Sequence, residues 1–106
     1  MSDEALVSIV VLNYNGGEAL LKCLRSLYES DYPRFEVIVV DNSSTDRSVE
    51  VVSTDFPGAI LIENRRNIGF GAGNNVGIKA SRGGYIVLLN NDVSVTRGWL
   101  RSLLHA

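Results

Sequence analysis

The sequence contains very little cysteine, histidine or proline. Its 106 residues include one cysteine (Cys23), one histidine (His105) and two prolines. A single cysteine excludes an internal disulfide and any zinc site built from several thiolates. We expect Cys23 to be a small, buried apolar residue and His105, at the end of the chain, to lie at the surface.

Long apolar runs and a strong net charge are also absent. No apolar run approaches the ~20 residues that a helix needs to cross a bilayer, and the formal net charge of −2 does not favour binding to nucleic acid. The first four residues (MSDE) include two acids and no base, whereas a signal peptide would begin with basic residues. These features favour a cytoplasmic protein without a transmembrane segment, of the size of one small domain.

Four apolar runs alternate with four stretches of helical character. The runs are rich in β-branched residues, which is typical of strands buried on both faces of a parallel sheet; they cover residues 7–12, 35–40, 59–62 and 85–89. The predicted helices cover residues 17–30, 44–53, 73–81 and 96–104. We expect N-caps within residues 44–46 and at Thr96, with Asp46 stabilising a helix N-terminus by its charge. This order predicts a single α/β domain with a mostly parallel sheet flanked by helices.

Polar residues follow three of the predicted strands. In parallel α/β sheets, ligands bind beyond the carboxyl ends of the strands. Tyr14 follows the first strand and can stack on a planar base, whereas Asp41 follows the second and can accept hydrogen bonds from a ribose hydroxyl or a base N–H. Asn90, Asn91 and Asp92 follow the fourth and offer oxygen ligands for Mg²⁺ or Mn²⁺. An ordinary turn also uses these residue types, so that alternative stays open.

The segment from Glu63 to Gly77 is rich in glycine, asparagine and arginine. Glycine-rich loops at helix N-termini bring backbone N–H groups to phosphates, and arginine adds charge-assisted hydrogen bonds. Arg65 and Arg66 are therefore candidates for a diphosphate contact, and Asn67 and Asn74 for further polar contacts with a ligand. A solvated loop that uses its glycines for turns is the alternative.

Four segments, in this order, resemble the family 2 glycosyltransferases of the GT-A fold. They are residues 7–15 (VSIVVLNYN), 39–46 (VVDNSSTD), 67–78 (NIGFGAGNNVGI) and 88–92 (LLNND). Each segment is short, but their order and spacing together are specific. The resemblance implies a GT-A (Rossmann-like) fold that is truncated after its metal motif. Residues 1–106 would then form the nucleotide-sugar-binding half of the domain.

The resemblance implies roles for the residues that would surround the nucleotide. Tyr14 and the backbone around Leu12 would hold the base, and Asp41 would accept a hydrogen bond from the base or the ribose. The family often has an arginine at the position of Asn74, so one of the two arginines at 65 and 66 would take over the diphosphate contact.

The resemblance also implies a metal site. Residues 90–92 match the family's Asp-x-Asp motif, in which Asp92 would bind the metal and Asn91 would lie near the ribose or the donor sugar. Asn90 is neutral where the family motif usually opens with an acid, so it would ligate the metal with lower affinity. The Asn-x-Asp form is similar to the branch of rhamnosyl- and related transferases of bacterial surface polysaccharides, which use dTDP- or UDP-linked donors.

The activity implied by the resemblance is an inverting transfer of a sugar from UDP or dTDP to a glycan or a lipid-linked acceptor, with Mg²⁺ or Mn²⁺. The acidic general base would lie beyond Ala106, in an acceptor-binding half that this sequence lacks. Residues 1–106 would therefore bind the donor and be inactive alone. The expected location is the cytoplasm, and peripheral association of the full-length enzyme with the inner membrane face is the alternative.

Other classes of protein share parts of this pattern. A non-catalytic nucleotide-binding or scaffolding domain would keep the fold without the chemistry. An NAD-type Rossmann domain needs Gly-x-Gly-x-x-Gly after the first strand, where this chain has residues 13–17 (NYNGG). A phosphorylation receiver domain needs further acids near Asp41 and a later lysine, and Lys79 falls within a predicted helix.

Overall fold

The structure is a computed structural model that describes residues 5–105. Four parallel strands form one sheet in the order β3-β2-β1-β4. Along the chain the elements are β1 (Val7–Asn13), α1 (Gly17–Tyr28), β2 (Phe35–Asp41), α2 (Ser48–Asp55), β3 (Ile60–Glu63), α3 (Phe70–Ala80), β4 (Tyr85–Asn90) and α4 (Trp99–Leu104). The predicted α/β class, with a parallel sheet flanked by helices, is confirmed.

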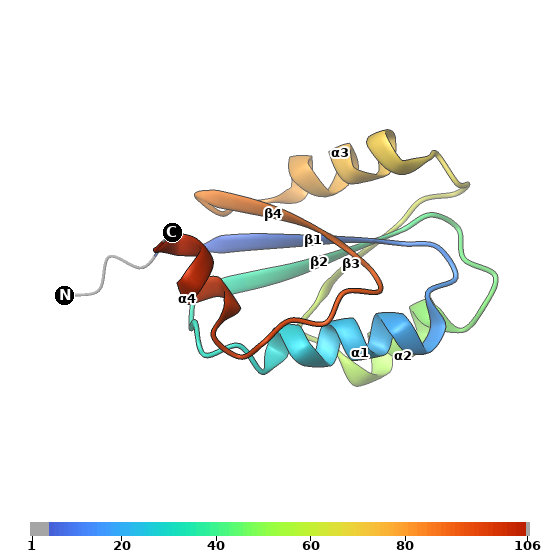
Figure 1. The fold of residues 1–106 in the computed structure, drawn as a ribbon. Helices are drawn as coiled ribbons and strands as arrows, with labels where there is room; N and C mark the ends of the chain where they lie inside the picture. The colour runs from blue at the N-terminus through green and yellow to red at the C-terminus, as the bar shows by residue number, and fades with distance from the viewer. Residues whose placement is uncertain (1–4, 106) are drawn as a thin grey trace.

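Helices cover both faces of the sheet. Helix α3 lies on one face and α1, α2 and α4 lie on the other, as Figure 1 shows. Successive side chains of a strand point to opposite faces. On β1, Ile9 and Val11 therefore pack on the side of α1, while Val10 packs on the side of α3, and all three are fully buried. Burial on both faces explains the unbroken apolar run of this central strand.

Helix α3 packs closely on the sheet because it presents two glycines to it. A Cβ atom on Gly77 would lie 2.3 Å from Cγ1 of Val10, and one on Gly73 would lie 2.6 Å from Cδ1 of Leu12. The helix begins at Phe70, three residues earlier than the sequence predicts. The reason is that Gly69, with φ of 87°, makes the preceding turn, and its carbonyl accepts the N–H of Gly73 (3.1 Å).

Helix α2 begins at Ser48, so the predicted start within residues 44–46 is wrong. Residues 44–46 form a loop because the side chains of Asp41 and Asn15 accept hydrogen bonds from their backbone N–H groups. The N–H of Ser44 donates to Oδ2 of Asp41 (2.9 Å), and Oδ1 of Asn15 accepts from residues 45 and 46 (2.7 and 3.1 Å). These hydrogen bonds stabilise the loop in place of a first helical turn.

Helix α4 also begins later than expected, at Trp99. Gly98 precedes it, and Thr96 contributes its backbone carbonyl, which accepts the N–H of Trp99 (3.2 Å), instead of a side-chain cap. Cys23 is fully buried and His105 is exposed, as predicted from the sequence.

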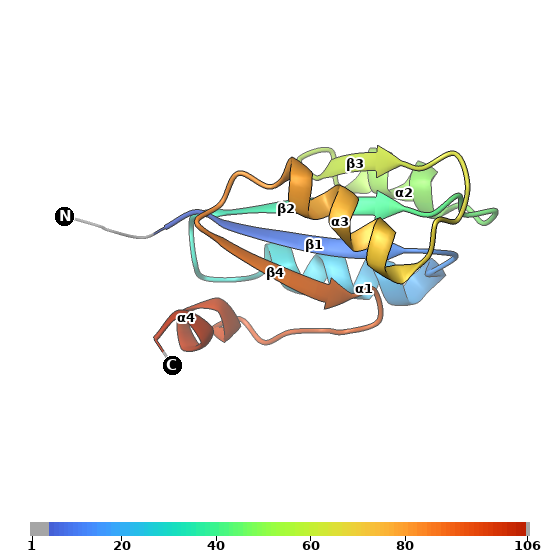
Figure 2. The same cartoon turned by 90° about the horizontal axis from the view of Figure 1, so that it is seen from above.

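Strand β4 forms an open edge of the sheet. Helix α3 lies over β1 and β2 and leaves β4 uncovered on that face (Figure 2). Ile86 and Leu88, whose side chains point to that face, are therefore 43% and 48% exposed. The carboxyl ends of all four strands lie at the opposite end of the sheet from the α3–β4 connection.

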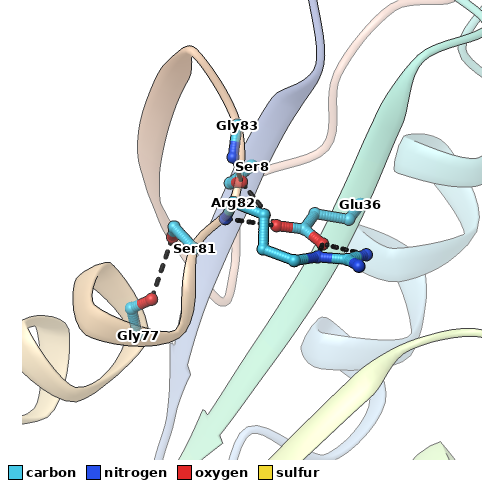
Figure 3. A network of polar contacts seen from close by, with 6 residues as sticks. All are labelled: Ser8, Glu36, Gly77, Ser81, Arg82 and Gly83. Carbon is cyan, nitrogen blue, oxygen red and sulfur yellow. Dashed lines mark hydrogen bonds and ion pairs between the residues drawn. The ribbon is translucent and has the colours of Figure 1, made fainter.

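A polar network fixes that connection to the amino ends of β1 and β2 (Figure 3). The hydroxyl of Ser8, which is fully buried, donates to Oε2 of Glu36 (2.6 Å) and accepts the N–H of Gly83 (2.8 Å). The Arg82 guanidinium donates twice to Oε1 of Glu36 (3.1 and 2.9 Å), and its backbone N–H donates to Oε2 (2.9 Å). The network holds the start of β4 beside β1.

The carboxylate at the centre of this network is favoured in its charged form. Burial alone raises the pKa of Glu36, but hydrogen bonds from Ser8 and Arg82, together with the Arg82 charge, outweigh burial and hold the pKa below its ordinary value. A carboxyl group whose pKa is lower in the folded state than in the unfolded state stabilises the fold at pH values above its ordinary pKa. That contribution is lost as the pH falls through the folded-state pKa.

We expect Glu36→Gln to lower the free energy of unfolding by about 1–3 kcal/mol at neutral pH, because it weakens a charged, buried acceptor. The difference from the wild-type chain should shrink as the pH falls through the folded-state pKa of Glu36. Urea unfolding across this pH range measures both effects. The control is Glu50→Gln, because Glu50 and its partner Arg47 are 66% and 84% exposed and should contribute little. Equal losses in the two variants would contradict this role.

Candidate functional site

A cavity of about 470 Å³ opens at the carboxyl ends of β1 and β4. In the strand order β3-β2-β1-β4, β2 and β3 are added on one side of β1 and β4 on the other side, so the order reverses at β1. Ligands of open α/β sheets bind at such a point of reversal. The volume also falls within the ~300–1,000 Å³ that is usual for small-molecule sites. We call this cavity the strand-end cavity; it is lined by Leu12, Tyr14, Asn42, Asn67, Gly69, Phe70, Asn74, Leu88, Leu89, Asn90, Asn91 and Asp92.

Seven residues singled out in the sequence meet in the strand-end cavity although they come from three separate segments. They are Leu12, Tyr14, Asn67, Asn74, Asn90, Asn91 and Asp92. Asp41, Arg65 and Arg66 do not line it. Five further residues line the cavity that were not predicted from the sequence, although each lies within a segment that resembles the family: Asn42, Gly69, Phe70, Leu88 and Leu89.

Asp41 lies at the same end of the sheet as Asp92 but below the cavity surface. It is 2% exposed, and its two carboxylate oxygens accept hydrogen bonds from other residues of the chain. Oδ1 accepts from Nδ2 of Asn13 (2.9 Å) and from the hydroxyl of Ser44 (2.6 Å), while Oδ2 accepts the N–H of Ser44 (2.9 Å). Its contact with a base or ribose stays a prediction.

Asn42 holds the loop that forms one wall of the strand-end cavity. Its Nδ2 donates to the carbonyl of Gly69 (3.1 Å), and its Oδ1 accepts from Nδ2 of Asn64 (2.9 Å). Oδ1 of Asn67 in turn accepts the N–H of Gly69 (2.9 Å). Asn42 is 3% exposed and directly follows β2, which is the position that drew attention to Asp41 in the sequence.

Arg65 and Arg66 are exposed on the loop after β3, outside the lining of the cavity. The carbonyl of Arg65 accepts a hydrogen bond from the hydroxyl of Ser43 (3.4 Å), which ties this loop to the loop after β2. A diphosphate contact from either guanidinium stays a prediction.

Among residues 5–105, four polar side chains of the cavity form no hydrogen bond with another residue: Tyr14, Asn74, Asn90 and Asp92. Asn74 is 6% exposed, and its carboxamide borders the cavity from the second turn of α3. Asp92 is exposed just beyond the end of β4. The Asn74 carboxamide is open to the cavity, because among residues 5–105 the fully enclosed side-chain polar atom without a partner is Nε1 of Trp99. A polar ligand in the strand-end cavity would supply the partner that Asn74 lacks.

Metal binding by this site would rest on few protein ligands. Within the described part of the chain, no group of three or more His, Cys, Asp or Glu side chains lies close enough to hold a metal ion. Asp92 and Asn90 offer one carboxylate and one amide oxygen. This donor set suits a hard cation that takes its other ligands from phosphate and water.

Cys23 lies beneath the same turn and is chemically inert there. Its Sγ is 3.9 Å from the carbonyl oxygen of Asn90, and burial together with the nearby charge of Asp92 raises the pKa of the thiol to about 11. The thiol is therefore neutral near neutral pH and does not act as a nucleophile.

Asp46 has the structural role that the sequence predicts. Its carboxylate accepts the N–H of Gly17 (3.2 Å) and the N–H of Ser48 (2.9 Å), which are the first residues of α1 and α2. Burial raises the pKa of Asp46, but hydrogen bonds from Ser48 and Gly17 outweigh burial and lower it. One side chain thus stabilises two helix N-termini next to the cavity.

The fold and the cavity together define an α/β domain of the GT-A type. The family model of glycosyl transferase family 2 matches residues 8–106, and the chain belongs to this family. Among residues 5–105, no helix is both long and apolar enough to span a bilayer.

A curated glycosyltransferase and a solved structure are similar to this chain. The chain is 37% identical over 100 residues to glycosyltransferase AglE of Haloferax volcanii. This match covers 89% of this chain and 33% of that protein. The structure of S. aureus TarS in complex with UDP-GlcNAc matches with a TM-score of 0.86 and 28% identity, covering 94% of this chain and 30% of that chain.

A second solved structure is similar at the same level. It is the mannosyltransferase PcManGT of Pyrobaculum calidifontis in complex with GDP-Man and Mn²⁺, with a TM-score of 0.80 and 29% identity. The match covers 88% of this chain and 29% of that chain. The chain therefore spans about a third of the length of these relatives.

We expect Asp46→Ala to lower the free energy of unfolding by about 1–2 kcal/mol, because two helix N-termini lose their acceptor. Chemical denaturation measures this change, and the loss should diminish as the pH falls through the lowered pKa of Asp46. Asp55→Ala is the matched control, because Asp55 is the last residue of α2, where a negative charge opposes the helix dipole. An Asp46→Ala chain as stable as the control would exclude this capping role.

Proposed function

We propose that this chain binds the nucleotide-sugar donor of a metal-dependent glycosyltransferase in the strand-end cavity. The observation that carries the proposal is the gathering of seven sequence-predicted residues around one cavity, four of them with a polar side chain that forms no hydrogen bond in the described chain. The cavity combines an exposed aromatic ring, several amides and a single carboxylate. A nucleoside diphosphate matches this chemistry with its flat base, its hydroxyls and its anionic phosphates.

The choice of a nucleotide is supported by the solved relatives. S. aureus TarS has been crystallised with UDP and with UDP-GlcNAc, and PcManGT has been solved with GDP-Man and Mn²⁺. For this chain we propose UDP- or dTDP-linked donors. Tyr14 would stack on the base with the backbone of Leu12 beside it, and Asn91 would face the ribose or the sugar.

Contacts with the diphosphate would come from the other wall of the cavity. Asn74 has a free carboxamide that is nine-tenths buried, and Asn67 lies on the same wall. Both lie where the first turn of α3 offers unpaired backbone N–H groups to an anion. Arg65 and Arg66 are mobile enough as long side chains on an exposed loop to add charge from outside.

We propose Asp92 as the protein ligand of a divalent cation, Mg²⁺ or Mn²⁺, with Asn90 as a weaker second ligand. The fit rests on the exposed Asp92 carboxylate, which no described residue engages. When bound, the cation supplies positive charge that stabilises the departing diphosphate. Loss of a single interaction of this kind typically costs about 2–4 kcal/mol in the transition state.

The transfer that we propose is a single displacement with inversion. The acceptor hydroxyl oxygen bonds to the anomeric carbon while the bond from that carbon to the phosphate oxygen breaks. The proton of the hydroxyl passes to a general base, and the electron pair of the broken bond leaves with the nucleoside diphosphate. We assign none of residues 5–105 as that base, so the part of the reaction proposed for this chain is donor binding and leaving-group stabilisation.

The remaining details extend the same proposal. We propose a glycan or lipid-linked acceptor and a rhamnosyltransferase-like specificity, in line with the Asn-x-Asp form of residues 90–92. The whole enzyme would work in the cytoplasm, at the inner face of the membrane if its acceptor is a lipid. A non-catalytic nucleotide-binding role remains the second candidate, and the neutral Asn90 favours it because a lost charge weakens metal binding.

We expect UDP or dTDP to bind about tenfold more tightly with Mn²⁺ than with EDTA, because Asp92 would hold the cation, whose charge would attract the phosphates. Asp92→Ala should remove this gain and leave the affinity in EDTA unchanged. Calorimetric titration of both chains, with and without metal, measures the two affinities. Asp55→Ala, a carboxylate removed outside the strand-end cavity, is the control and should keep the full gain.

Two results of this titration would decide against the proposal. Equal affinity of the wild-type chain with and without metal would leave only the non-catalytic role. Tight binding of NADH with no binding of UDP or dTDP would indicate a dinucleotide-binding domain instead.

A further inference from the structure

Asn13 is a buried amide that joins the ends of three segments. It is the last residue of β1, is 1% exposed and does not line the strand-end cavity. Its Nδ2 donates to Oδ1 of Asp41 (2.9 Å) at the end of β2. Its Oδ1 accepts from the N–H of Gly16 (3.1 Å) and from Nδ2 of Asn91 (2.9 Å) in the turn after β4.

The backbone N–H of Gly16 fixes the direction of these hydrogen bonds. It can only donate, so Asn13 turns its oxygen toward Gly16 and its NH₂ group toward the carboxylate of Asp41. The same oxygen faces Asn91, which must therefore donate to it. The orientation of the Asn91 carboxamide is thus set through one intervening side chain, which Gly16 and Asp41 hold.

Gly16 makes room for the link between Asn13 and Asn91. A Cβ atom on Gly16 would lie 2.3 Å from Oδ1 of Asn13 and 2.7 Å from Nδ2 of Asn91. Its backbone, with φ of −71° and ψ of −22°, suits any residue. Glycine is therefore required here for space and not for conformation, which is evidence independent of the hydrogen bonds themselves.

We propose that Asn13 is a positioning residue through which Asp41 holds the 90–92 turn, and with it Asp92, in place for the cation. The effect on metal binding rests on the function proposed above, whereas the effect on the turn does not. Partners that orient a metal ligand without touching the metal typically change metal affinity by about 10–100-fold. Asp41 thereby gains a role other than the predicted contact with the base or ribose, because it acts on the 90–92 turn through Asn13.

Two variants break the link in different ways. Asn13→Leu has nearly the same shape but neither donor nor acceptor, and Gly16→Ala wedges a methyl group between Asn13 and Asn91 without changing either. Gly58→Ala is the matched control, because a Cβ atom there meets nothing within 4 Å. If Asn13→Leu fails to fold, the Gly16→Ala chain still tests the proposal.

The first readout is the order parameter of the backbone N–H of Asn91 and Asp92, measured by ¹⁵N relaxation in the free chain. We expect values near ~0.85 in the wild-type and Gly58→Ala chains and a fall toward ~0.6 in the other two. The second readout is the gain in UDP affinity with Mn²⁺ over EDTA. It should fall about tenfold in the two variants, whereas UDP affinity in EDTA should fall by a smaller factor, because only the contact of Asn91 with the ribose or the sugar is affected there.

The two readouts separate failure of the positioning role from failure of the proposed function. Unchanged order parameters in both variants would overturn the positioning role, as would a metal gain that survives intact. A wild-type chain without a metal gain would overturn the metal site, but order parameters that fall in the variants would still support the positioning role. A purely structural role for Asn13 would instead weaken UDP binding equally with and without metal.

Discussion

Parallel pairing of β1 with β2 along one edge and with β4 along the other brings three strand ends to the same level. The register pairs Asn13 with Asp41 and Leu12 with Asn90, so the polar residues that follow these strands start side by side. Since β1 is buried on both faces and flanked on both edges, it cannot slip by one residue without exposing its apolar side chains. The position of the strand-end cavity follows from this register.

The two ends of the sheet differ in how their polar groups are satisfied. At the amino ends, Glu36 accepts hydrogen bonds from Ser8 and Arg82, and the network around it fixes the start of β4. At the carboxyl ends, internal hydrogen bonds hold the loops, but four polar side chains of the strand-end cavity form none within the described chain: Tyr14, Asn74, Asn90 and Asp92. A protein tolerates such polar groups where a ligand or water satisfies them, so their grouping at one end marks that end for binding.

The apolar pattern was sufficient to predict the sheet and the general place of the site. The β-branched runs of β1 and β2 predict strands because both faces of these strands are buried. The position of polar residues just after the strands then predicts their meeting in space. Tyr14 and Asp92, for example, were expected together because parallel strands end at one edge, and both line the same cavity.

The sequence did not predict features that depend on hydrogen bonds between distant loops. The late start of α2 depends on Asn15, whose oxygen binds the N–H of a residue 30 positions away. The link from Asn13 to Asn91 spans 78 positions, and no local pattern marks either residue as a donor or an acceptor for the other. The close packing of α3 on the sheet could not be predicted for the same reason, because it depends on the contact of Gly77 with Val10 of β1.

The central claim is that a cation and a nucleotide meet at the carboxyl ends of β1 and β4, and paramagnetic broadening by Mn²⁺ tests it most directly. With UDP present, substoichiometric Mn²⁺ should broaden the backbone N–H signals of Tyr14, Phe70 and residues 90–92 in a ¹⁵N-labelled chain. It should leave the signals around Glu36 and Arg82, at the other end of the sheet, unaffected. Broadening centred on that other end, or spread evenly over exposed carboxylates, would contradict the account.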